Sequence, residues 1–172
     1  GEGTNEIHTT LLEQVAEFAT GKCGNLLHAD VRVRLGLLQR AIAGGVGSAW
    51  SDWFFEGPGG NAMDLIHRAD DLLVQAWVRT STAAVAELAR KGDAELAYLL
   101  ANFHSYGPPA FVDPDKAALY EVLGFELLKR SNAIPADHQP FRERAASAAL
   151  DKLPAERAAT IKLEVATILS KL

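Results

Sequence analysis

Apolar side chains recur at intervals of three and four residues along almost the whole chain, which is typical of amphipathic helices. In the segment 5–19 they stand at Ile7, Leu11, Val15 and Phe18. In the segment 29–43 they stand at Val31, Leu35, Leu38 and Ile42. Glycines follow both segments, so we expect each to form one helix that ends there.

Capping residues and prolines predict where the later helices begin. We expect helices over 62–79, 114–130 and 139–152, and a last helix that starts at Pro154. The helix over 114–130 has the clearest start, because Asp113 precedes a proline that occupies the first helical position.

Between these segments, Ser81 or Thr82 is expected to open a separate helix. Gly92 can interrupt that helix and Asp93 can restart it. Residues 44–60, GGVGSAWSDWFFEGPGG, are expected to form a long loop or a short-helix excursion. The predicted fold is therefore all-α, an up-and-down bundle of about seven helices or two such bundles stacked on each other.

Composition limits the classes of protein that this chain can belong to. Its 172 residues are 48% hydrophobic, which allows one core or two small ones. No apolar run approaches the roughly 20 residues needed to span a bilayer, so we expect no membrane span. A net charge of −5 argues against nucleic acid as a partner. Cys23 is the only cysteine, which rules out an internal disulfide and indicates either a reducing compartment or a fold that needs no disulfides.

The first residues place a carboxylate next to a predicted helix start. Glu2 stands between Gly1 and Gly3, and glycine neighbours allow the backbone to approach a ligand closely. In an enclosed apolar pocket such a carboxylate would have a raised pKa and could act as a general base. The competing interpretation is a disordered chain end.

The heptapeptide E-G-T-N-E-I-H at positions 2–8 leads directly into the amphipathic segment. It resembles the signature near the end of the catalytic domain of flavin-dependent acyl-CoA dehydrogenases, and acyl-CoA oxidases carry a similar version. The resemblance implies that Glu2 removes the α-proton of an acyl-CoA thioester while a hydride passes from the β-carbon to FAD. It also implies that Glu2 and Gly3 bind substrate and that Thr4 and Glu6 lie near FAD. The family often has arginine after the histidine, whereas this chain has Thr9.

The same resemblance implies a domain division. Residues 1–22 would be the end of the catalytic helical domain, and residues 23–172 would be a C-terminal helical extension like that of the oxidases. The N-terminal helical domain and the β-domain would then be partners that this chain lacks, and the isolated chain is expected to be inactive. Family members commonly form dimers or tetramers, so a homo-oligomer is implied.

The last three residues, Ser170-Lys171-Leu172, match a peroxisomal address. The match can also be accidental, because Leu172 continues the apolar stripe of the last predicted helix. We expect an intracellular protein that is cytoplasmic if the source is bacterial and peroxisomal if it is eukaryotic.

Other residue clusters favour structural roles. His67 and Asp70 are expected to share a helix face, and Asp70 and Asp71 to lie on a solvated one, with no metal site. Residues 57–60 are glycine-rich but lack the lysine of a nucleotide-binding loop. Arg142, Glu143 and Arg144 are expected to form an ordinary charged helix face.

The densest aromatic patch comprises Trp50, Trp53, Phe54 and Phe55. These rings are expected to seal the bundle, since aromatic side chains dominate core burial. The alternative is a docking surface for other domains or a second subunit. A non-catalytic helical interaction or oligomerisation module therefore stands beside the enzyme hypothesis.

Overall fold

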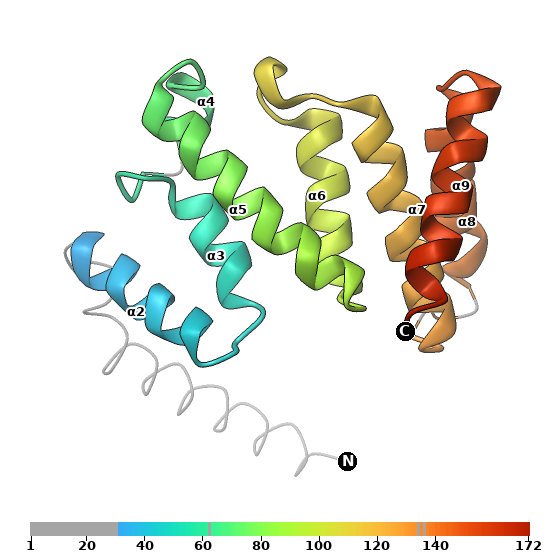
Figure 1. Ribbon diagram of the computed structural model, residues 1–172, viewed down its shortest axis with the longest axis horizontal. Helices are drawn as coiled ribbons and strands as arrows, with labels where there is room; N and C mark the ends of the chain where they lie inside the picture. The colour runs from blue at the N-terminus through green and yellow to red at the C-terminus, as the bar shows by residue number, and fades with distance from the viewer. Residues whose placement is uncertain (1–30, 62, 134, 136) are drawn as a thin grey trace, which may run out of the picture.

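The computed structural model describes residues 31–61, 63–133, 135 and 137–172, and in these residues the chain is all-α, as predicted. Figure 1 shows the helices, which are α2 (Val31–Ala43), α3 (Ala49–Glu56), α4 (Asp64–His67), α5 (Leu72–Arg90), α6 (Ala94–Tyr106), the 3₁₀ turn η1 (Pro109–Phe111), α7 (Pro114–Arg130), α8 (Gln139–Asp151) and α9 (Ala155–Leu169). None of these helices is long and apolar enough to cross a membrane.

Successive helices pack side by side in an up-and-down arrangement. α5, α6 and α7 form the middle of the molecule and contact one another in chain order. α8 and α9 both pack on α7 at one end, whereas α3 packs on α5 and carries α2 at the other end (Figure 1). The two ends of the described bundle are therefore built from different parts of the sequence.

Two predicted helix starts are confirmed by side-chain caps. The Asp93 carboxylate accepts a hydrogen bond from the backbone N–H of Leu96 at 3.0 Å, and Asp113 accepts one from Lys116 at 3.1 Å. Such caps satisfy amides that have no partner within the helix. The predicted range 114–130 agrees with α7.

The predicted break near Ser81 is wrong, because α5 runs unbroken from Leu72 to Arg90. Ser81 is completely buried in the middle of this helix. The hydroxyl of Thr82 donates to the carbonyl of Val78 at 2.7 Å, so it bonds to the preceding turn and caps nothing. The cap is Asp71, whose carboxylate accepts from the N–H of Leu73 at 2.8 Å. The expected helix over 62–79 is therefore split between α4 and the first half of α5.

The segment 44–60 contains α3, so the short-helix alternative for this segment is confirmed. Gly57 follows the last residue of α3, and its φ of +69° is favourable only for glycine. At Gly124 of α7 an added Cβ would lie 3.1 Å from the ring of Tyr98 on α6. This glycine therefore lets α6 and α7 approach closely.

The buried side chains form two clusters. The larger one joins the second half of α5 to α6, α7, α8 and α9, with Leu100 and Leu123 among its fully buried members. The smaller one consists of Phe54, Leu65, Val74, Val78 and Phe103. α5 and α6 contribute to both clusters, so they connect the two ends of the described bundle.

Candidate functional site

The residues that the sequence predicts for catalysis lie outside the described part of the structure. These are Glu2, Gly3, Thr4 and Glu6, and Cys23 lies outside it as well. The predicted domain boundary between residues 22 and 23 also falls there. Their roles toward acyl-CoA and FAD stay predictions, and the described residues supply the remaining evidence on function.

The aromatic patch on α3 is divided between the core and the surface. Phe54 is fully buried and meets the ring of Phe103 edge-on, with centroids 4.8 Å apart. Trp53 stacks on Trp77 of α5, with centroids 4.3 Å apart. The indole N–H of Trp77 donates to the carbonyl of Phe54 at 3.3 Å. The prediction that these rings seal the bundle is thus confirmed for Phe54, whereas Phe55 is 51% exposed.

Phe55 borders a large cleft between α3, α4, α6 and α8, which we call the aromatic cleft. Its volume is about 860 Å³. Its apolar walls are formed by Phe54, Phe55, Leu65, Ile66, Tyr98, Leu99, Phe103, Tyr106, Pro108 and Pro109. Ser51, Glu95, Asn102 and Arg142 add polar groups. Apolar walls with a few polar groups are the usual lining of ligand and partner sites.

Arg142 is the cation of the aromatic cleft, and its position corrects the expectation of an ordinary charged helix face. Its guanidinium carbon lies 4.6 Å from the centroid of the Tyr98 ring, a geometry that favours cation–π attraction. Burial raises the pKa of Tyr98 to about 12, although the charge of Arg142 opposes this shift. Burial also raises the pKa of the nearby Glu121 carboxyl, again against Arg142. Glu143 and Arg144 are exposed, as expected.

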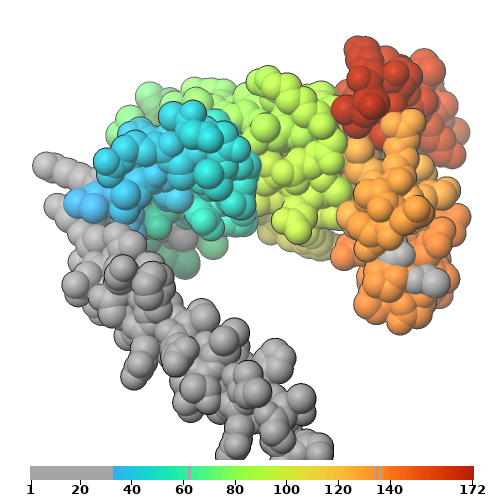
Figure 2. Space-filling view, turned by 90° about the horizontal axis from the view of Figure 1, so that it is seen from below, coloured from blue at the N-terminus to red at the C-terminus, as the bar shows by residue number. Residues whose placement is uncertain are grey.

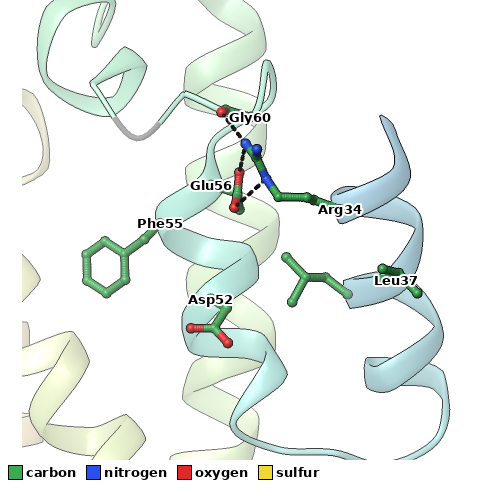
Figure 3. Close-up of a pocket in the computed structure, with 7 residues that line it drawn as sticks. Arg34, Leu37, Asp52, Phe55, Glu56 and Gly60 are labelled. Atoms are coloured by element: carbon green, nitrogen blue, oxygen red, sulfur yellow. Dashed lines mark hydrogen bonds and ion pairs between the residues drawn. The ribbon is translucent and has the colours of Figure 1, made fainter. Parts of the chain in front are cut away.

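A second, smaller hollow of about 550 Å³ lies between α2 and α3. Figure 3 shows Arg34 reaching from α2 to the carboxylate of Glu56, at 3.2 and 3.3 Å, and to the carbonyl of Gly60 at 3.2 Å. Arg34 thereby links α2, the end of α3 and the glycine-rich loop that follows. This loop is therefore held by an arginine side chain.

His104 of α6 is a buried titratable group that the sequence analysis did not single out. Its Nδ1 donates to the carbonyl of Phe111 at 3.0 Å, and its ring stacks on Tyr120 with centroids 6.2 Å apart. Burial lowers the pKa of the imidazole below its ordinary value of 6.5. Burial of His104 could be inferred from the sequence, because it lies on the apolar face of α6 with Leu96 and Leu100. Its hydrogen bond to Phe111 could not, because that residue follows the proline turn.

The acidic pair Asp70-Asp71 does not lie on a solvated helix face. His67 is the last residue of α4 and Asp70 lies in the following turn, so the two do not share a helix. Asp71 caps α5 and pairs with Arg68 at 2.5 Å, and the resulting hydrogen bond lowers the pKa of its carboxyl. Among the described residues no group of three or more histidine, cysteine or acidic side chains could hold a metal ion.

At the other end, Ser170, Lys171 and Leu172 follow α9 and are exposed. An exposed tripeptide is a requirement of a receptor-read address, and the localisation stays a prediction.

Comparisons of the chain with protein-family models, with curated proteins and with solved structures find no match. The evidence on function is therefore the heptapeptide motif together with the helical fold and its surface hollows.

Proposed function

We propose that this chain forms the C-terminal part of an FAD-dependent acyl-CoA dehydrogenase or oxidase, in which Glu2 is the catalytic base. The observation that carries the proposal is the heptapeptide at positions 2–8, whose last four residues begin the amphipathic segment 5–19. A carboxylate beside glycine at a helix start suits a base that must approach a thioester closely.

The described fold supports this proposal in two respects. The described residues between 31 and 172 form helices joined by turns and contain no strand, as an additional C-terminal helical domain of an oxidase would. Their surface also carries hollows where other domains of an enzyme could pack, among them the aromatic cleft and the one between α2 and α3. Both features agree with residues 23–172 acting as an extension outside the chemical step.

In the proposed reaction, Glu2 takes the α-proton of the acyl-CoA, and the electron pair of that C–H bond becomes part of the new α,β double bond. FAD bound beside this segment would supply the acceptor for the hydride of the β-carbon. Backbone N–H groups at the helix start would polarise the thioester carbonyl and thereby stabilise the developing negative charge. Gly3 would permit the close approach of substrate, and Thr4 and Glu6 would border the cofactor.

The test is Glu2→Gln in the enzyme that contains this sequence. Loss of a general base is expected to slow acyl-CoA dehydrogenation by roughly 10²–10⁴-fold, while flavin absorbance per protein stays at the wild-type level. Glu13→Gln, a matched change in the same segment, should retain full activity. The proposal fails if E2Q dehydrogenates acyl-CoA at the wild-type rate, or if the isolated 172-residue chain alone binds FAD and turns over acyl-CoA.

The second candidate is a non-catalytic helical interaction or oligomerisation module. The observation that favours it is the aromatic cleft, whose rim residues Phe55 and Tyr106 are 51% and 83% exposed. If this function is correct, Tyr106→Ala should weaken self-association in analytical ultracentrifugation, and E2Q should have no effect. Leu163→Ala, at a 70% exposed position of α9, is the control.

A further inference from the structure

The aromatic cleft has the size and the lining of a small-molecule site. Its volume of about 860 Å³ is within the range of pockets that hold drug-sized ligands. In Figure 2, α3 lies on one side of α6 and α8 on the other. Phe55 of α3 and Phe103 and Tyr106 of α6 contribute rings to the walls. Such walls favour a flat aromatic ligand, because aromatic rings attract one another in stacked and edge-on contacts.

The charged groups of the cleft favour an anion over a cation. Arg142 is half-buried, and among the described residues no carboxylate forms an ion pair with it. The half-buried Glu121 of α7 interacts with the charge of Arg142 without pairing with it. Glu95 also lines the cleft, but it is exposed and therefore solvated by water. Since attraction between opposite charges grows where water is excluded, an anion beside Arg142 gains more than a cation beside Glu95.

The hydroxyl of Tyr98 is a second, independent indication of a ligand. This oxygen is buried, and it has no hydrogen-bond partner among the described residues. Buried polar groups are nearly always paired in folded proteins. Tyr98 lines the cleft, and the guanidinium of Arg142 lies over its ring. A carboxylate that approaches Arg142 would therefore bring an acceptor close to this hydroxyl.

We propose that the aromatic cleft binds a small aromatic carboxylate. The ring of the ligand packs against Phe55 and Tyr106, and its carboxylate pairs with Arg142 and accepts from Tyr98. The ligand thus accounts for the exposed rings, for the guanidinium without an ion-pair partner and for the hydroxyl without a hydrogen-bond partner. This inference goes beyond the proposed function and does not depend on Glu2. A second copy of the chain is the competing occupant, and the tests below distinguish it from the ligand.

The first test measures equilibrium binding of three probes to the 172-residue chain. Cinnamate, neutral cinnamyl alcohol and cationic cinnamylamine share one flat aromatic body and differ in charge. Cinnamate should bind at least about tenfold more tightly than the alcohol, because hydrogen bonds to a charged group contribute more than neutral ones. The amine should bind most weakly. The inference is wrong if cinnamate does not bind, if the three probes bind equally, or if the amine binds most tightly.

The second test changes the charges of the cleft one at a time. Arg142→Gln should lower the affinity for cinnamate to that for cinnamyl alcohol, whereas Glu95→Gln should raise it by about two- to threefold because a like charge is removed. Arg144→Gln, at an exposed position of the same helix, is the matched control and should leave the affinity unchanged. Equal losses in R142Q and R144Q would indicate unspecific attraction to positive charge and would overturn the inference.

The third test locates the ring of the ligand and does not require a buried residue to be changed. Tyr106 is 83% exposed, and Tyr106→Ala should weaken cinnamate and cinnamyl alcohol by the same factor of about two to ten, since both lose one ring contact. Leu163→Ala on α9 is the control. An unchanged affinity in Y106A overturns the inference. So does a cinnamate affinity that falls as the protein concentration rises, because a second copy would then occupy the cleft.

Discussion

Single residues of the aromatic patch differ sharply in what they contribute. Phe54 and Phe55 are neighbours in the sequence, yet Phe54 is fully buried and Phe55 is 51% exposed. Consecutive residues of a helix point about 100° apart, so Phe54 packs against Phe103 in the core while Phe55 lies at the rim of the aromatic cleft. The sequence predicts that the patch is packed, and only the position of α3 on α5 determines which ring is inside.

Phe54→Ala should therefore be strongly destabilising. Removing a fully buried phenylalanine that packs edge-on against Phe103 is expected to lower the free energy of unfolding by about 3–5 kcal/mol. Phe55→Ala, a matched change one residue away, should cost less than about 1 kcal/mol. Urea unfolding of both variants measures this difference. Equal losses would mean that the packing of α3 described above is wrong.

His104 makes stability depend on pH. In the unfolded chain its imidazole gains a proton near pH 6.5, whereas burial lowers the pKa in the folded chain. Between these two values the unfolded state binds more protons, so the free energy of unfolding falls as pH decreases. The neutral ring makes its full contribution to the free energy of unfolding above pH 6.5, and this contribution is lost progressively as the pH falls below 6.5.

His104→Gln should flatten this dependence, because glutamine does not titrate. The measurement is the difference between wild type and H104Q in the free energy of unfolding, followed from about pH 7.5 to 5 across the ordinary histidine range. His138→Gln is the control, since the His138 side chain is 69% exposed. If H104Q loses stability on acidification as steeply as the wild type, burial of the imidazole does not act in this way.

At the scale of helices, the sequence predicts a helix start well where only one residue nearby can cap the helix. Asp113 before Pro114, and Asp93 after Gly92, each offer a single favourable cap, and α7 and α6 begin where these residues predict. Ser81 and Thr82 can also cap a helix. Their hydroxyls can instead donate to the carbonyl one turn earlier, as the hydroxyl of Thr82 does to Val78. Ser81 lies inside α5 because it is buried among packed side chains. This burial depends on tertiary packing and cannot be inferred from the neighbouring residues in the sequence.

The Asp93 cap allows a matched pair of substitutions. Asp93→Ala removes the acceptor for the Leu96 N–H and should lower the free energy of unfolding by about 1 kcal/mol. Asp93→Asn keeps an oxygen acceptor at the same position and should retain most of the wild-type stability. Thermal or urea unfolding distinguishes the two. Equal stability of D93A and wild type would show that the cap contributes nothing.

At the scale of the whole molecule, the helical spacing of apolar residues predicts the all-α class. It does not predict the aromatic cleft. The aromatic cleft brings together Phe55 of α3, Tyr98 of α6 and Arg142 of α8, which are far apart in the sequence. Arg142 belongs to a run of charged residues that is indistinguishable from an ordinary solvated surface, and its position over Tyr98 depends on how α8 folds back along the bundle. The heptapeptide could be recognised because all of its residues are contiguous.

The link from Arg34 to Glu56 and Gly60 has a consequence for cleavage of the chain. A loop as rich in glycine as residues 57–60 is normally an easy substrate for proteases, which need several residues to extend into their active sites. Here one end of the loop is anchored to α2, so its cleavage should require that α2 first detach. The rate at which a protease nicks this loop would then report how often the α2 end of the molecule opens.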